Sequence, residues 1–283
     1  KRTIVMLHGL ASSPEAWINV ANELMGDEQL RRRYQIWQVY YPSNAPLAAN
    51  NAAIRKALTA TLAQFDPTGK KPASNDLVLI GHSMGGVLAR LMVSDASNTL
   101  LDAITEEYNL KGKKAEKVRA GLAPYLNFTA MPQVNRAVFI AAPHRGTSFA
   151  NHKVARWIAN LITLPINMLE QLSDAAGSLA QLDTGSSEPL RIPNSIDNLS
   201  DKDPFVRLVA DLPISPKVRY YSIMGNDTPD LPLAESSDGV VPYASAHLDG
   251  ALSEKVIPSW HSVQESPQAI LEIRRILRLP DSP

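Results

Sequence analysis

The sequence predicts an α/β fold in which helices flank a mostly parallel central sheet of about six strands. Short apolar runs alternate along the chain with segments of helical periodicity, which is the pattern of consecutive strand–helix units. Several of these runs are continuously apolar, as expected for strands that are covered on both faces. A glycine-rich turn at residues 81–86 also joins one apolar run directly to a helical pattern.

Six apolar runs are predicted to be the strands of this sheet: residues 3–7, 34–40, 76–80, 136–141, 218–224 and 255–257. Four segments with helical spacing of apolar side chains are predicted helices: residues of about 14–25, 48–65, 85–94 and 264–277.

The alternation predicts a single domain over residues 1–283 with two insertions. The first insertion, at about 98–134, is polar and charged. The second, at about 147–215, carries an amphipathic pattern between residues 154 and 172. Such a pattern predicts either a helix packed on the core or a helical cap over a site.

The composition is that of an ordinary globular protein and excludes several kinds of chemistry. Of the 283 residues, 45% are hydrophobic and 20% are charged, and 28 basic side chains balance 28 acidic ones. This balance argues against nucleic acid as a partner. No apolar run approaches the roughly 18 residues that a transmembrane segment needs. The chain has no cysteine, so disulfides, thiolate catalysis and cysteine-bound metals are excluded.

The strongest motif is the run Gly81-His82-Ser83-Met84-Gly85, which lies between a predicted strand and a predicted helix. A sharp strand-to-helix turn of this kind holds a serine in a strained conformation, and small residues two positions before and after it prevent clashes. The hydroxyl then projects above the sheet at the N-terminus of the helix. The alternative is a glycine-rich turn that only packs closely. Because a serine hydroxyl is a weak nucleophile at neutral pH, Ser83 would need a base and an orienting carboxylate.

Together with three other motifs, this run resembles the α/β-hydrolase superfamily, in particular bacterial lipases and esterases. The matching segments are residues 3–9 (TIVMLHG), 81–86 (GHSMGG), 142–147 (APHRGT) and 237–242 (SDGVVP). Each run is short, and the specificity comes from their combination across most of the chain. Two departures are the lack of further strands before residue 3 and Ala142 in place of a common threonine. The resemblance implies an α/β-hydrolase fold.

The resemblance also implies a triad in the chain order serine, acid, histidine. His261 is the expected base because it follows a short predicted strand and precedes the closing helix, on the side of the sheet where ligands bind. His247 is the alternative, although its segment has helical character. The remaining histidines fit less well: His8, His82, His144 and His152.

Asp238 is the expected acid of this triad. It lies between the last two predicted strands, and the glycine that follows it permits a tight turn. Its role would be to accept the imidazole N–H, fix the tautomer and stabilise the imidazolium. Asp227 and Asp230 are alternatives in the same loop, where aspartate is also common as a turn or cap residue. The predicted catalytic residues are therefore Ser83, Asp238 and His261.

An oxyanion hole is expected from the backbone N–H groups of Leu10 and Met84, at the positions that the resemblance implies. Leu10 and Trp17 are the expected substrate-binding residues, with Met84 and the apolar stripe at 154–172 completing an apolar acyl site. This arrangement predicts carboxylic esters with an aliphatic acyl chain as substrates.

No cofactor and no metal are expected. Related lipases sometimes bind calcium near the acid and histidine loops, but Asp227, Asp230 and Asp238 do not have the spacing of a dedicated calcium loop.

The resulting hypothesis is an esterase or lipase that forms an acyl-enzyme on Ser83. The alternatives are an amidase, a thioesterase or an acyltransferase with the same triad, or a hydrolase-fold protein that binds without catalysis. The expected partner is a small-molecule or lipid ester, with transient contact to a lipid interface. The resemblance to lipases favours a periplasmic or secreted location. Because the first strand begins almost at Lys1, we also expect an upstream segment in the full-length protein.

Overall fold

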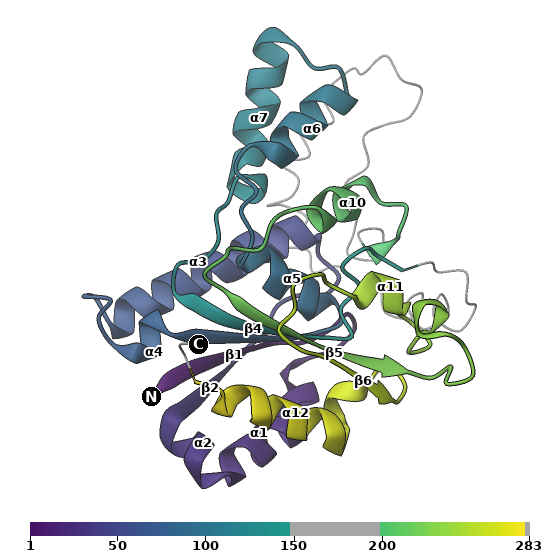
Figure 1. Ribbon diagram of the computed structural model, residues 1–283. Helices are drawn as coiled ribbons and strands as arrows, with labels where there is room; N and C mark the ends of the chain where they lie inside the picture. Colours follow the sequence, from purple (N-terminus) through teal and green to yellow (C-terminus); the bar gives the residue numbers. More distant parts are fainter. Residues whose placement is uncertain (148–198, 281–283) are drawn as a thin grey trace.

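The computed structural model describes residues 1–147 and 199–280, which form a six-stranded sheet with helices on both faces (Figure 1). The strand order is β2-β1-β3-β4-β5-β6, and every neighbouring pair is parallel. The strands are β1 (Arg2–Leu7), β2 (Tyr34–Val39), β3 (Leu77–His82), β4 (Val134–Ile140), β5 (Arg219–Asn226) and β6 (Glu254–Pro258). All six lie where the sequence predicts strands, so the predicted fold class is confirmed.

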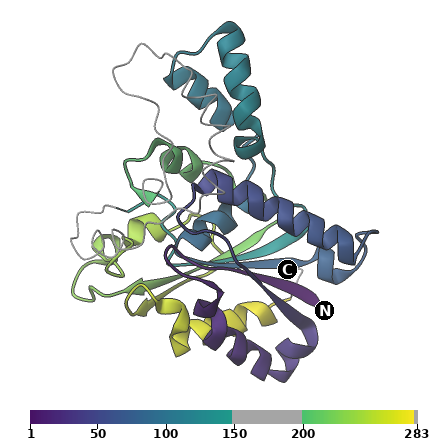
Figure 2. The same cartoon turned by 180° about the vertical axis from the view of Figure 1, so that it is seen from behind.

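Helices from different parts of the chain cover the two faces of the sheet. One face carries α1 (Ile18–Gly26), α2 (Glu28–Arg33) and α12 (Pro267–Arg278), and the other carries α3 (Leu47–Phe65) and α5 (Met84–Met92), as Figures 1 and 2 show from opposite sides. Side chains of a strand alternate between these faces. In β1, Ile4 and Met6 therefore enter one core while Val5 and Leu7 enter the other. This is why β1 is apolar at four consecutive positions, from Ile4 to Leu7.

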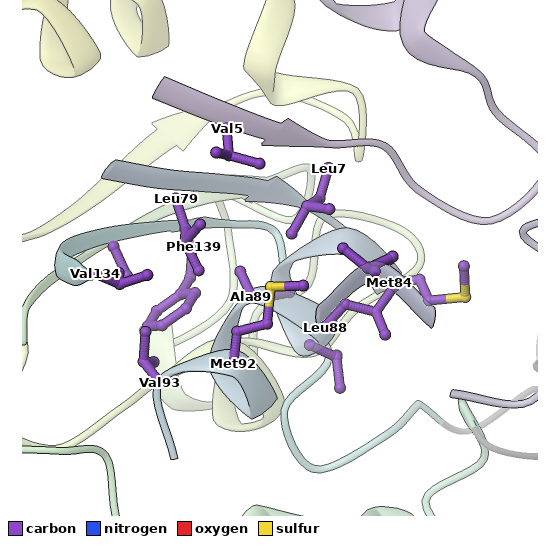
Figure 3. Packing of buried hydrophobic residues seen from close by; sticks show 14 of the residues in the cluster. Val5, Leu7, Leu79, Met84, Leu88, Ala89, Met92, Val93, Val134 and Phe139 are labelled. Atoms are coloured by element: carbon purple, nitrogen blue, oxygen red, sulfur yellow. The ribbon is translucent and has the colours of Figure 1, made fainter. Parts of the chain in front are cut away.

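The core between the sheet and α5 fixes the position of that helix. Val5, Leu7, Leu79 and Phe139 from three central strands pack in one cluster with Leu88 of α5 (Figure 3). All nine residues of α5 are buried. A helix packed in this way cannot shift without disturbing the close-packed core, so the turn that precedes it at residue 83 is held in place.

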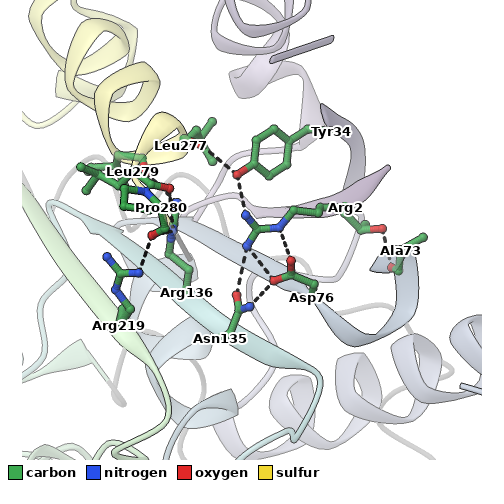
Figure 4. Close-up of polar contacts among 12 residues, drawn as sticks. Arg2, Tyr34, Ala73, Asp76, Asn135, Arg136, Arg219, Leu277, Leu279 and Pro280 are labelled. Atoms are coloured by element: carbon green, nitrogen blue, oxygen red, sulfur yellow. Dashed lines mark hydrogen bonds and ion pairs between the residues drawn. The ribbon is translucent and has the colours of Figure 1, made fainter. Parts of the chain in front are cut away.

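A charged network closes the amino edge of the sheet (Figure 4). Arg2 donates hydrogen bonds to the Tyr34 hydroxyl (3.0 Å) and to Oδ1 of Asp76 (2.6 Å). Tyr34 donates in turn to the carbonyl oxygen of Leu277 in α12 (2.9 Å), and Arg136 donates to the carbonyl oxygen of Ile276 (2.7 Å). Cations are favourable at the C-terminal carbonyls of a helix, so these contacts anchor the end of α12 beside the first strand.

The predicted polar insertion at 98–134 contains two helices that the sequence did not predict. They are α6 (Thr99–Glu107) and α7 (Gly112–Leu126), and they project away from the sheet (Figure 1). Their apolar side chains Leu100, Leu101 and Leu126 pack near Leu91 of α5 in a separate small cluster. The two helices are therefore held by this small cluster and not by the two cores on the faces of the sheet.

The remaining elements are short: η1 (Pro14–Trp17), α4 (Pro72–Asn75), α10 (Pro204–Ala210), η3 (Leu233–Glu235), α11 (Tyr243–Ala246) and η4 (Val263–Glu265). The amphipathic pattern at 154–172, predicted as a core helix or a cap, lies outside the described residues. In the described part of the chain, no helix has the length and apolar character needed to cross a membrane.

Candidate active site

Three of the predicted site residues form one hydrogen-bonded chain at the carboxyl edge of the sheet. Nε2 of His261 lies 2.9 Å from Oγ of Ser83, and Nδ1 of the same ring lies 2.7 Å from Oδ2 of Asp238. Ser83 follows β3, Asp238 lies beyond β5 and His261 follows β6. The carboxyl ends of parallel strands share one edge, which brings together residues that are far apart in the sequence. All three are buried, with exposed fractions of 7%, 2% and 6%.

The turn that carries Ser83 has the strained conformation expected of it. Ser83 has φ 55° and ψ −126°, in the left-handed region that side chains rarely adopt. Its N–H donates to the carbonyl of Ile140 in β4 (2.8 Å). A Cβ on Gly81 would overlap the backbone of Gly85, and a Cβ on Gly85 would overlap the backbone of Leu7. Only glycine at both positions lets the strand, turn and helix approach this closely.

The carboxylate of Asp238 is oriented by its own loop. Oδ1 accepts the backbone N–H groups of Val240 (2.9 Å) and Val241 (2.6 Å), which leaves Oδ2 for the imidazole. Gly239 has φ 86°, and the ring of Trp260 fills the space that a Cβ there would need. These two N–H donors fix the plane of the carboxylate, so the loop suits a residue that orients a histidine.

A second loop, after β4, braces the acid loop from outside. The Thr147 hydroxyl donates to the carbonyl of Val240, the residue whose N–H binds Asp238. The backbone N–H of Arg145 donates to the Ser245 hydroxyl (3.2 Å), and its guanidinium donates to the carbonyl of His247 (2.7 Å). The motif at 142–147 therefore contributes support for the acid loop, a role that the sequence did not reveal.

The oxyanion hole expected from the backbone N–H groups of Leu10 and Met84 stays a prediction, and two observations bear on it. Met84 is the first residue of α5, whose N-terminus favours negative charge. The turn at Gly9 lies against the serine, since a Cβ on Gly9 would be 3.1 Å from Cβ of Ser83. In the described residues, no acceptor takes the N–H of Leu10 or Met84.

Tyr41 holds the loop that carries Leu10. Its hydroxyl donates to the carbonyl oxygen of His8, and the two rings stack with centroids 4.2 Å apart. Tyr41 is only 4% exposed, and burial raises the pKa of its hydroxyl, so the group remains a donor. Burial lowers the pKa of the His8 ring, because it disfavours the charged imidazolium. This pair is therefore neutral and acts as a packed support for the turn.

Two further histidines near the site are kept neutral by burial. Burial, with a smaller contribution from the neighbouring His261, lowers the pKa of His82 to about 3. Burial and the adjacent Arg90 and Arg145 hold the pKa of His144 well below its usual range. Neither ring is therefore available as a charged group at neutral pH.

The alternative acid and base residues lie apart from this chain. His247 contacts Oε2 of Glu254 (2.6 Å) and Oδ1 of Asp249 (3.2 Å), and the Glu254 hydrogen bond raises its pKa. Asp227 and Asp230 are exposed. None of the three has a hydrogen bond to Ser83 or His261 in the described residues.

The structure corrects the prediction for Trp17. Its side chain is fully buried, at 0% exposure, and packs with Val20 and Leu24 in the core on the α1 and α12 face. An aromatic residue with helical spacing to other apolar residues is a core residue here, so it does not contact a substrate. Leu10 and Met84 belong instead to the apolar cluster on the other face.

In the described residues, no group of three or more histidine and acidic side chains is placed to hold a metal ion.

A parallel sheet that presents a serine on a strained strand-to-helix turn defines the α/β hydrolases as a structural class. The model of the alpha/beta hydrolase family matches residues 4–273, and the chain belongs to that family. No curated protein matches the sequence.

Two solved structures have the same fold at low sequence identity. The mature form of the lipase BlEst2 from Bacillus licheniformis is similar with a TM-score of 0.54 and 17% identity, over 99% of this chain and 93% of that one. EstA from Clostridium botulinum is similar with a TM-score of 0.59 and 13% identity, over 98% of this chain and 87% of that one.

Proposed function

We propose that this protein is a serine hydrolase that cleaves carboxylic esters through an acyl-enzyme intermediate on Ser83. The observation that carries the proposal is the continuous hydrogen-bonded chain from the serine hydroxyl through His261 to Asp238, with separations of 2.9 and 2.7 Å. A nucleophile, a base and an orienting carboxylate within hydrogen-bond reach are the arrangement needed to activate a serine.

In the first half of the reaction, Oγ of Ser83 attacks the acyl carbon while Nε2 of His261 takes the hydroxyl proton. The carbonyl oxygen becomes an oxyanion, which the N–H groups of Leu10 and Met84 stabilise. Each such donor is typically worth about 3 kcal/mol in the barrier. The bond to the alcohol oxygen then breaks, and the imidazolium gives its proton to that oxygen.

In the second half, water replaces the alcohol. His261 takes a proton from the water as its oxygen attacks the acyl carbon, and the same proton returns to Oγ of Ser83 when the carboxylic acid leaves. Asp238 accepts the Nδ1–H throughout and keeps the imidazole oriented. Its two backbone N–H donors support that role by fixing the plane of the carboxylate.

The apolar character of the site favours an aliphatic acyl group. Leu10 is an apolar residue that follows the turn lying against the serine, and apolar side chains bind acyl chains by excluding water. The name of one similar structure, a lipase at 17% identity, is consistent with an ester substrate. We therefore expect small-molecule or lipid esters to be better substrates than amides and thioesters.

The test combines covalent labelling with turnover. A fluorophosphonate probe is expected to label the wild-type protein at Ser83, and p-nitrophenyl esters of increasing chain length are expected to be hydrolysed. Ser83→Ala is the matched control, because it removes one oxygen atom and keeps the fold. Equal labelling or equal hydrolysis by the two proteins would contradict the proposal and favour a binding function. Corresponding amides and thioesters assayed in parallel determine the preferred leaving group.

A further inference from the structure

His82 contacts the backbone of the proposed general base, although 179 positions separate the two residues in the sequence. Its Nε2 lies 2.9 Å from the carbonyl oxygen of His261, and the two rings are tilted by 46° with centroids 5.1 Å apart. A carbonyl oxygen only accepts hydrogen bonds, so Nε2 of His82 carries the proton. The ring is 8% exposed, and burial holds its pKa at about 3. It is therefore neutral at pH 7, with Nδ1 unprotonated.

The backbone of His261 itself has little other hydrogen-bonded support. Residues 259–262 connect β6 to η4 without helix or strand structure. Across residues 1–147 and 199–280, the bond from His82 is the one hydrogen bond made by the backbone of His261. The side chain of His261 is bound at both nitrogens, by Ser83 and Asp238. The hydrogen bond from His82 therefore holds the backbone of His261, in addition to the two contacts that hold its ring.

We propose that His82 is a positioning residue whose Nε2–H holds the His261 carbonyl, so that the imidazole keeps its contacts with serine and carboxylate. This inference rests on the proposed function. His82 adjoins Ser83 in the chain, and all the residues of β3 are buried. One rigid unit therefore aims the hydroxyl and also anchors the loop that carries its base.

The charge state of His82 suits this role. During the reaction His261 becomes a cation, and a second positive charge on a ring whose centroid is 5.1 Å away would oppose that step. A neutral imidazole offers the same N–H without the repulsion. Asp238 is the other ionisable group that influences His82 electrostatically, and its effect opposes that of His261.

Two substitutions of His82 distinguish the effect of its hydrogen bond from the effect of its volume. His82→Gln keeps an N–H that reaches the place of Nε2, whereas His82→Leu has a similar volume and no donor. We expect kcat per active site to fall by about 10- to 100-fold in His82→Leu, with KM little changed, because a small misplacement of a catalytic group costs this much. His82→Gln should stay within about threefold of the wild type, in keeping with the modest net value of one hydrogen bond.

Active-site titration with a fluorophosphonate makes these rates independent of folding yield. Full stoichiometry with slow labelling in His82→Leu supports the positioning role. A His82→Leu protein as fast as the wild type, or a His82→Gln protein as slow as His82→Leu, would overturn it.

A measurement on the wild-type protein needs no variant to fold. Nitrogen-15 NMR of labelled histidine is expected to show His82 as the neutral Nε2–H tautomer, with no titration between pH 5 and 9. An Nδ1–H tautomer, or titration of this ring in that range, would refute the contact even in an active enzyme. If the wild type is not labelled by the fluorophosphonate, the proposed function fails instead, and the role of His82 in it fails too. The two failures are therefore distinguishable.

Discussion

The two edges of the sheet both hold buried polar side chains, but they are built differently. At the amino edge, Arg2 donates hydrogen bonds to Asp76 and Tyr34. Arg136 donates to a carbonyl oxygen at the end of α12. At the carboxyl edge, Ser83 has a strained backbone, and in the described residues the N–H groups of Leu10 and Met84 have no acceptor. Strain and unused donors persist only where the surrounding structure compensates for them. The amino edge is held by paired charges, whereas the carboxyl edge keeps a strained turn at the site proposed for catalysis.

The largest expected effect is on the carboxyl edge, in Asp238→Asn. An amide at this position favours the wrong imidazole tautomer, and kcat for a p-nitrophenyl ester should fall on the order of 10⁴-fold. Its oxygen still accepts the N–H groups of Val240 and Val241, so the thermal midpoint should change little. Asp227→Asn is the matched control in the same loop, where the carboxylate is exposed. Equal losses in the two variants would show that Asp238 is not the acid.

The next effect is on the amino edge, in Asp76→Ala. The side chain of Arg2 is only 8% exposed, and removing its carboxylate partner should lower the free energy of unfolding by about 3 kcal/mol. The rate per fluorophosphonate-labelled site should stay near that of the wild type. Glu28→Ala breaks the exposed pair with Arg32 and should cost roughly 0.5 kcal/mol or less. A large loss of rate per labelled site in Asp76→Ala would break the proposed division between the edges.

A third test uses the pH dependence of stability to examine the buried His82 at the carboxyl edge. The pKa of His82 is lowered from 6.5 to about 3 in the folded protein, so between these values the unfolded chain binds one more proton at this position. Stability must therefore fall as the pH drops below 6.5, with a slope of about 1.4 kcal/mol per pH unit from this residue. Urea unfolding between pH 7 and 4 should show a shallower slope in His82→Gln. An unchanged slope would mean that His82 is not held neutral in the folded state.

The smallest expected effect is in Tyr41→Phe, which removes the donor to the His8 carbonyl. The turn that carries Leu10 would be less well held, and kcat should fall about fivefold, corresponding to roughly 1 kcal/mol. Tyr220→Phe is the control, because that hydroxyl also binds a backbone carbonyl, at Asp249, and has no contact with this turn. If both variants lose rate equally, the effect of Tyr41 is general rather than local.

The fold was predictable because its signals are local. A continuously apolar strand such as Leu77–His82 and the Gly-x-Ser-x-Gly turn after it depend on neighbouring residues alone. The predicted partners Asp238 and His261 came from the resemblance to α/β hydrolases, which implies the order of the triad, together with their places after strands. The structure brings these two residues to Ser83.

The supporting residues were not predictable in this way. The contact of His82 with His261 and the brace from Thr147 to Val240 join loops that are distant in the sequence, and no spacing pattern marks them. Trp17 was misplaced for a related reason. An apolar side chain near the first turn fits a pocket or a core equally well until the packing of α12 over that face is known. The helices α6 and α7 were missed because their polar exposed faces hide a narrow apolar side.

The anchoring of both chain ends at the amino edge has a practical consequence. Arg2 and the end of α12 are linked through Tyr34, on the side of the sheet opposite Ser83. A label or a solid support attached next to Arg2 or at the end of α12 would therefore lie at the edge of the sheet away from Ser83. Attachment at either place would keep the carboxyl edge of the sheet away from the support.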